Sequence, residues 1–516
     1  MFLWGQEPVW LHNRAVVEAN QVVSNDSIIT VGGIFQEELQ GKTSQGGVDI
    51  FFYQYNSQQQ LLGKYHLGGT GKEHLAALAG LAEGGWYGVG SFEDSLFFGA
   101  KDTLLLEQGS SFFVGKWQGQ QQLEWARTLT STGFMQVWDA KSDAAGNLYL
   151  TGSFRDSLLL DSFPPLVASC TEAPFLLQIN PQGQIVWGIS SPMCQEATGK
   201  SLALDEQGNL YWVGEFRGVF QLKDTFEKAH VVYRDLFLVR VEVQTGEVLT
   251  QKQFTGVYDN QCTALEYANN KLYLAGQFSG YLQLDSFLLR TAFKTFSNAY
   301  LAELDSNGQT LWATQSSAFA DASVTTLAVK GKRIALGGYY QDSLLWEEEK
   351  ASSVHKSEAF FLNFYDKKIE TLVTGQGAGF DVVRGVVIEE QDYSWWVGGF
   401  QDSIVLGNTL GIAQGYSDGF IWRRKAALGS FNKYPSPSPS FLFSQLQLSP
   451  QPAQDSCFIN LPKGVLLESW QLYNTKGQLI QTGQSPFILT SQLPQKVYSL
   501  HVYTSEGLAI EKLLVE

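Results

Sequence analysis

The sequence predicts an all-β protein in which a seven-bladed β-propeller, closed by an N-terminal strand, precedes a small β-sandwich. The first observation behind this prediction is a repeated Gly-x-Phe or Gly-x-Tyr signature. Its glycines are Gly33, Gly90, Gly152, Gly214, Gly276, Gly338 and Gly398, at steps of 57, 62, 62, 62, 62 and 60 residues. A period this regular is typical of repeat architectures. The second observation is that four strand-like runs recur within each period.

The period that begins at Ser201 gives the clearest example of the four runs. Residues 201–205, Ser-Leu-Ala-Leu-Asp, form a run rich in small residues, and residues 210–216 carry the signature after Gly208-Asn209. An apolar run at 236–241 and a fourth run at 247–249 complete the unit. Short β-branched and aromatic runs separated by Gly and Asn indicate strands rather than helices. The apolar third run recurs at 50–53, 112–114, 175–177, 236–238, 300–302, 360–362 and 420–422.

The last repeat lacks its fourth run, because residues 420–422 lead directly to Arg423-Arg424-Lys425. The missing run stands at the beginning of the chain, as Glu7-Pro8-Val9-Trp10. An N-terminal strand that completes the last repeat would close a ring and cover two exposed sheet edges. We therefore expect the propeller to occupy residues 1–428.

The composition changes after this region. Residues 429–443 are rich in Pro and Ser, which predicts an extended linker. Residues 444–516 lack the signature but alternate like strands, with turns at Lys476-Gly477 and Glu506-Gly507. About 70 such residues favour a small antiparallel sandwich.

Composition and charge exclude several classes of function. The formal net charge is −16, and an acidic protein repels phosphate backbones, so we expect no nucleic-acid partner. No apolar stretch approaches the roughly 18 residues that span a bilayer, so we expect no membrane span. The start, Met1 to Gln6, is too short for a signal peptide.

Two groups of polar residues resemble functional motifs but are explained by turns. Asp-Ser pairs begin at Asp94, Asp156, Asp342 and Asp402, at one fixed place after the signature, where Asp and Ser favour turns. Residues 305–308, Asp-Ser-Asn-Gly, look like the start of a calcium loop but lack the acidic residues that should follow. Their counterpart at 180–183 occupies the same hairpin, which also favours a turn.

No catalytic, metal or cofactor motif stands out. The six His are scattered, without an i, i+4 pair, and no Cys-x-x-Cys or phosphate loop occurs. Propellers usually bind through loops around the mouth of the central channel. By register, the residues that start the innermost strands include Trp138, Asp139, Lys200, Gln261 and Arg384.

These mouth residues fit a polar ligand such as a glycan, or a protein, and they equally fit a solvated channel. Two functions therefore stay open: a binding or adhesion module, and a propeller enzyme that cleaves polysaccharide or peptide. A close pair of carboxylates at the mouth would favour the enzyme.

The four cysteines allow one specific pairing to be predicted. If the hairpin turns at Pro181-Gln182, then Cys170 and Cys194 face one another, within disulfide range. Cys262 and Cys457 have no comparable partner.

The periodic region resembles the seven-bladed propeller repeats of bacterial extracellular proteins. The match is close at residues 146–154 and at residues 183–187, Gly-Gln-Ile-Val-Trp, and the pattern recurs in register over about 420 residues. The resemblance implies a secreted or surface protein that uses the propeller as a platform.

The tail resembles the type A sorting domain that the type IX secretion system of Bacteroidetes recognises. Residues 448–453 stand at its Pro-x-Pro start, with Pro450 and Pro452, and 472–480 match its strand-turn-strand core around Gly477. Residues 493–498 match its Leu-x-x-Gly-Val-Tyr with Tyr498, although Lys496 replaces the glycine and Gln451 replaces an Asn. The resemblance implies the secretion machinery as a partner and a location outside the cell or on the outer-membrane surface. It also implies an N-terminal signal peptide, which we expect to be missing or truncated in this sequence.

Overall fold

The computed structural model describes residues 7–25, 28–81, 84–98, 103–105, 110–119, 122–223, 225–226, 232–292, 295–318, 320–353, 356–377, 379–389, 392–425, 446–461, 466–474, 478–494, 496–504 and 507–515. Its elements β1 to β46 are all strands. The protein is therefore all-β over the described ranges, as the sequence predicted.

Four-stranded antiparallel units follow one another up to residue 425, and the second strand of each carries the Gly-x-Phe or Gly-x-Tyr signature. The first three are β2 (Val17–Asn25), β3 (Ile28–Leu39), β4 (Lys42–Asn56), β5 (Leu61–Leu67); β6 (Glu73–Gly80), β7 (Trp86–Phe92), β10 (Ser110–Gln118), β11 (Gln122–Ser131); and β12 (Met135–Ser142), β13 (Leu148–Phe154), β16 (Ala173–Ile179), β17 (Ile185–Ser190).

The next three units are β18 (Met193–Leu204), β19 (Asn209–Gln221), β21 (Asp235–Glu242), β22 (Val248–Gly256); β23 (Asn260–Ala268), β24 (Lys271–Ser279), β27 (Ser297–Asp305), β28 (Thr310–Ser317); and β29 (Ala322–Lys330), β30 (Arg333–Tyr340), β33 (Glu358–Tyr365), β34 (Lys368–Gly377). The last unit is β35 (Val382–Ile388), β36 (Tyr393–Phe400), β39 (Asp418–Lys425) and β1 (Val9–Leu11). This succession of antiparallel sheets is the architecture of a β-propeller.

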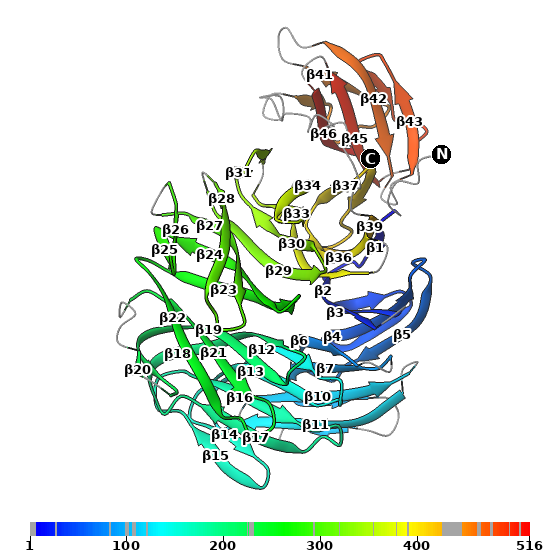
Figure 1. Cartoon of the computed structure of the whole chain (residues 1–516). Coiled ribbons are helices and arrows are strands. Elements are labelled where there is room, and N and C mark those ends of the chain that lie inside the picture. Colours follow the sequence, from blue (N-terminus) through cyan, green and yellow to red (C-terminus); the bar gives the residue numbers. More distant parts are fainter. Residues whose placement is uncertain are drawn as a thin grey trace.

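The N-terminal strand belongs to the last unit of the series. Strand β1 pairs antiparallel with β39, and Trp10 lies opposite Phe420. The connection after β1 is also attached to this unit, because the backbone N–H of Asn13 and the ring of His12 both bond the Asp418 carboxylate. Strand β2 packs against both β6 and β35. In Figure 1 the sheets surround a common centre in chain order, and the yellow last sheet lies beside the blue first one.

Burial explains why the middle strands of each unit are almost continuously apolar. Every residue of β13 and β16 is buried, because sheets of neighbouring units cover both faces. Adjacent Trp395 and Trp396 are both fully buried, one in each of two different core clusters. Strands buried on both faces lose the polar alternation of a half-exposed strand.

Aromatic residues of the repeat also join one unit to the next. The indole N–H of Trp125 donates to the Pro181 carbonyl at 2.8 Å, and Trp187 donates to Val243 at 2.9 Å. Each tryptophan thus binds the outer hairpin of the following unit. These bonds give a structural reason for the Trp in the fourth strand of these two units.

Extra hairpins extend several sheets at the outer edge. They are β14 (Ser157–Leu160) with β15 (Phe163–Val167) on β11, β25 (Tyr281–Leu284) with β26 (Phe287–Arg290) on β22, β31 (Ser343–Trp346) with β32 (Glu349–Ser352) on β28, and β37 (Ser403–Leu406) with β38 (Thr409–Ile412) on β34. Strand β8 (Ser95–Phe97) pairs with β9 (Thr103–Leu105), and β20 (Thr225–Phe226) pairs with β19. Each long hairpin comes from one unit and pairs with the outer strand of the unit before it.

The turn interpretation of the Asp-Ser pairs is confirmed. Asp94, Asp156, Asp342 and Asp402 have φ of 61°, 60°, 58° and 55°, the left-handed conformation that Asp tolerates in turns. The calcium-like residues 305–308 also form a turn, in which the Asp305 carboxylate accepts the N–H groups of Asn307 and Gln309.

The described part of the tail forms two antiparallel sheets around one core. The sheets are β40 (Gln447–Ser449), β41 (Ser456–Asn460), β44 (Phe487–Leu489) and β43 (Leu479–Gly483), β42 (Leu467–Tyr473), β45 (Lys496–Thr504), β46 (Gly507–Val515). Pro450 and Pro452 lie between β40 and β41, and the buried Tyr498 donates its hydroxyl to the Pro494 carbonyl at 3.0 Å. The predicted linker 429–443 and Gly477 lie outside the described residues.

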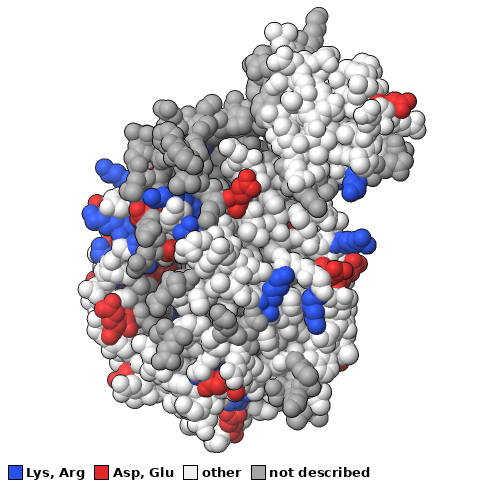
Figure 2. Space-filling view, turned by 90° about the vertical axis from the view of Figure 1, so that its right-hand side faces the viewer, with Lys and Arg blue, Asp and Glu red and all other residues white. Residues whose placement is uncertain are grey.

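The charged side chains visible in Figure 2 are scattered, with both signs interspersed among uncharged surface. Within the described ranges, no helix is long and apolar enough to cross a membrane.

Candidate functional site

A β-bulge in each innermost strand positions the predicted mouth residues. In each innermost strand one residue faces the signature glycine of the second strand, and the residue directly after it has no partner in the register. Trp138, Lys200 and Arg384 occupy this bulged position in their strands. A bulge re-aims a side chain. The signature glycine is required at this point: a Cβ on Gly152 would lie 1.9 Å from the Gln136 carbonyl oxygen. The position of the signature glycine in each repeat thus fixes the position of the bulged residue opposite it.

Three of the five predicted residues meet in one cleft of about 190 Å³. The cleft is lined by Trp138, Glu172, Glu196, Thr198, Lys200, Glu215, Arg234 and Gln261. The Trp138 side chain is 46% exposed, and the Lys200 ammonium lies 3.7 Å from the centre of its ring. This distance is that of a cation–π contact.

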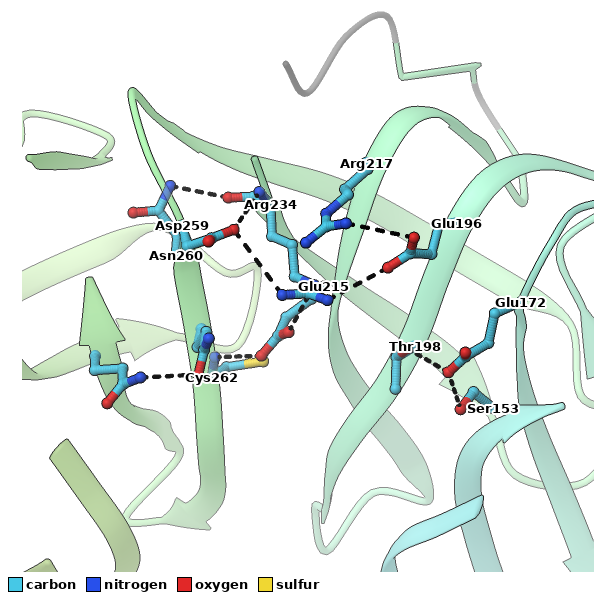
Figure 3. A network of polar contacts seen from close by, with 12 residues as sticks. Ser153, Glu172, Glu196, Thr198, Glu215, Arg217, Arg234, Asp259, Asn260 and Cys262 are labelled. Atoms are coloured by element: carbon cyan, nitrogen blue, oxygen red, sulfur yellow. Dashed lines mark hydrogen bonds and ion pairs between the residues drawn. The ribbon is translucent and has the colours of Figure 1, made fainter. Parts of the chain in front are cut away.

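Arg234 is the centre of the charge network in the cleft (Figure 3). Its guanidinium lies 3.3 Å from Glu196, 3.7 Å from Glu215 and 4.0 Å from Asp259. Arg217 adds a second contact to Glu196 at 3.5 Å. Arginine and carboxylate groups therefore neutralise one another along this wall, which holds both in place.

Glu172 forms the other wall. Its carboxylate accepts hydrogen bonds from the Ser153 hydroxyl at 2.7 Å and from the Thr198 hydroxyl at 3.4 Å. Arg155 pairs with the same carboxylate at 3.2 Å. Glu172 is thus held between two strands of neighbouring units.

Glu215 lies at the bottom of the network and is only 5% exposed. The backbone N–H of Cys262 donates to its carboxylate at 3.2 Å. Burial raises the pKa of Glu215, and the charges of Lys200 and Arg234 oppose that rise. A buried carboxyl of this kind binds a proton more tightly than an exposed one.

The predicted disulfide between Cys170 and Cys194 is present, with Cα atoms 5.4 Å apart. The prediction placed both cysteines on the β16–β17 hairpin, and this placement is wrong. The pairing of β16 with β17 ends at Ser190, and Cys194 lies on β18 of the next unit. Glu172 and Glu196 each follow a bonded cysteine by two residues. The disulfide therefore ties together the two segments that carry these cleft carboxylates.

The other two predicted mouth residues lie outside this cleft. The Asp139 carboxylate accepts hydrogen bonds from the Ser201 hydroxyl and the Leu202 N–H, at 2.8 and 2.9 Å, and so joins adjacent innermost strands. Arg384 pairs with Glu18 at 3.1 Å, between the last and first units. Both side chains therefore join neighbouring units of the series.

Sequence reasoning found Lys200 but missed the other charged residues of the cleft, which are Glu172, Glu196, Glu215 and Arg234. Glu215 had a visible signal, because it occupies the variable position of Gly-x-Phe, where the other copies have Ile34, Ser91, Ser153, Gln277, Tyr339 and Gly399. A charge inside an otherwise buried apolar strand is a candidate functional residue. Arg234 had no such signal.

Among the described residues, no group of three or more His, Cys, Asp or Glu could hold a metal ion. No protein-family model and no curated protein sequence matches the chain.

Solved structures similar to this chain include a β-propeller domain and a WD40 domain. One is the β-propeller domain of the Trilobed protease from Pyrococcus furiosus (6% identity, 82% of this chain and 97% of that one, TM-score 0.40). Others are the Pan2 WD40 domain of Neurospora crassa (10%, 69% and 91%, TM-score 0.34) and Kuenenia stuttgartiensis hydrazine synthase (10%, 75% and 94%, TM-score 0.42).

Proposed function

We propose that this protein is an exported, surface-displayed or secreted binding protein whose propeller is the ligand-binding platform. The observation that carries the proposal is the cleft, which brings an exposed indole, a lysine and an amide together with a fixed charge network. Convergent polar groups beside an aromatic surface are typical of sites for polar ligands. The ligand is a glycan or a protein.

The platform in this proposal is a closed seven-bladed ring of residues 1–428. Two observations support closure: the pairing of β1 with β39, and the packing of β2 against both β6 and β35. A closed ring would hold the mouth residues of opposite blades at fixed distances.

Export is the second part of the proposal, with residues 444–516 as the sorting domain that type IX secretion recognises. The resemblance of the tail and the two-sheet arrangement of its described strands support this role. The Cys170–Cys194 disulfide is weakly consistent with a destination outside the cytoplasm.

Export is tested by fusing residues 429–516 to an unrelated reporter that carries a signal peptide, in a host with this secretion system. We expect the reporter to reach the surface and the tail-less propeller to stay in the periplasm. Surface delivery of the tail-less propeller at the level of the full chain would refute the sorting role.

Ligand binding is tested by screening the purified full chain against glycan and protein arrays. We expect Trp138→Ala to abolish the strongest interaction. The matched control is Phe163→Ala, since Phe163 is 45% exposed on the outer edge strand β15. Equal loss of binding in both variants, or none in either, would refute the assignment of the cleft.

A secreted enzyme that cleaves polysaccharide or peptide is the second candidate, and the carboxylates favour it. Glycoside hydrolysis uses two carboxyl groups in unequal environments. Glu215 is buried with a raised pKa, whereas Glu196 lies beside two arginines. The test is release of soluble products, which Glu215→Gln should abolish while leaving binding intact.

A further inference from the structure

Lys200 differs from the other cations at the cleft. Arg155, Arg217 and Arg234 each have a carboxylate within 4.0 Å. Within the described ranges, no carboxylate lies within 4.0 Å of the Lys200 ammonium, which lies over the Trp138 ring instead. The cleft therefore offers one positive charge that the protein leaves without a direct ion pair.

The surroundings of Lys200 restrict the charge of the group that it can receive. Glu172, Glu196 and Glu215 all line the same cleft, so a doubly charged phosphate would meet several carboxylates at short range. A single negative charge beside Lys200 meets less repulsion. The same carboxylates and the Gln261 amide can accept hydrogen bonds from hydroxyl groups.

The size and the aromatic wall restrict the rest of the ligand. About 190 Å³ is smaller than the roughly 300–1,000 Å³ of sites for drug-sized molecules, so the cleft holds one ring-sized unit. The apolar face of a sugar ring stacks on an exposed indole such as that of Trp138. Tyr233 and Tyr258, whose rings lie 5.0 Å apart, directly precede Arg234 and Asp259 in the sequence.

We propose that the cleft binds one saccharide unit that carries a single negative charge, as a uronic acid or a monosulfated sugar does, within a longer glycan. This inference rests on the proposed binding function and names its ligand class. Lys200 pairs with the charged group, Trp138 stacks on the ring, and Glu172, Glu196 and Gln261 accept hydrogen bonds from its hydroxyl groups.

Isothermal titration of the full chain with paired oligosaccharides tests the proposal. One pair is an oligouronate and its carboxyl-reduced neutral counterpart, and the other is a sulfated oligosaccharide and its desulfated form. We expect at least one charged member to bind about tenfold or more tightly than its neutral counterpart, because a charge-assisted hydrogen bond is lost in the latter. The pair that shows the difference identifies the anionic group.

Variants assign the preference to Lys200. We expect Lys200→Gln to remove the difference between charged and neutral ligands, and Lys200→Arg to retain it. The control is Lys332→Gln, which removes an exposed lysine paired with Asp366. Trp138→Ala should weaken binding of charged and neutral members alike.

Three results would overturn the inference. They are equal affinity for charged and neutral members, a charge preference that survives in Lys200→Gln, and binding of proteins only. Each of these leaves the proposed binding function intact, provided that binding depends on Trp138. Binding of neither glycans nor proteins would instead refute the proposed function itself.

Discussion

The signature glycine and its neighbour in the last repeat offer a matched test of why the repeat needs glycine. A Cβ added at Gly398 would lie 2.1 Å from the Val382 carbonyl oxygen, whereas one at Gly399 would lie 3.4 Å from its nearest neighbour, the Glu18 side chain. Ordinary contact begins near 3.4 Å, so Gly398→Ala must push two strands of the sheet apart by more than an ångström. The Cβ of Gly399→Ala would meet the flexible Glu18 side chain and, at 3.7 Å, the Asp418 carbonyl oxygen, which are both ordinary contacts.

We expect Gly398→Ala to destabilise the protein by about 2–3 kcal/mol, because over-packing typically costs 1–3 kcal/mol and the obstacle here is backbone. Gly399→Ala should change the stability by less than about 1 kcal/mol. Urea denaturation of the full chain, followed by tryptophan fluorescence, measures both. If the two variants unfold at the same urea concentration, the close approach of strands at the bulge does not explain the signature.

Three further predictions concern closure, the disulfide and pH. Deletion of residues 1–12 should lower the melting temperature, because β39 loses its partner strand; an unchanged midpoint would contradict closure. Replacing Cys170 and Cys194 with Ser should cost about 3 kcal/mol, and native alkylation should label neither cysteine of the exported protein; labelling of both would show the bond absent. Burial raises the pKa of Glu73 from 4.5 to about 8 and that of Glu358 to about 7, so folding binds their protons more tightly. The stability they contribute is complete below pH 4.5 and is lost progressively as the pH rises from 4.5 through 7 to 8. The melting temperature should therefore fall between pH 4.5 and 8, and the fall should be smaller in Glu73→Gln.

The sequence predicted the all-β architecture because a propeller repeats one pattern in register. The glycine spacing and the apolar third runs each correspond to a contact that recurs from unit to unit. The N-terminal partner of the last unit could be inferred because one run was missing at residue 423 and one was surplus at residue 7. Such features depend on the period alone.

The cleft was harder to predict because it depends on departures from the period. Trp138 and Lys200 were found from register, but the bulge that positions them leaves no mark in the sequence beyond the glycine. Arg234 contacts Glu196 on β18, Glu215 on β19 and Asp259 before β23. Only the folded chain brings these three carboxylates together. Asp139 has a residue type that fits a binding site, yet its hydrogen bonds hold two strands together.

The outer hairpins have a consequence for how the molecule unfolds. Strands β14, β25, β31 and β37 each complete a sheet that begins in the preceding unit, so adjacent units share backbone hydrogen bonds as well as side-chain packing. Loss of one unit would expose the edge of its predecessor, which makes partial unfolding costly. An array of repeats joined only by side-chain packing between neighbours can fray from its ends. Here backbone hydrogen bonds add to that packing, so heating should give one cooperative transition for this part of the chain.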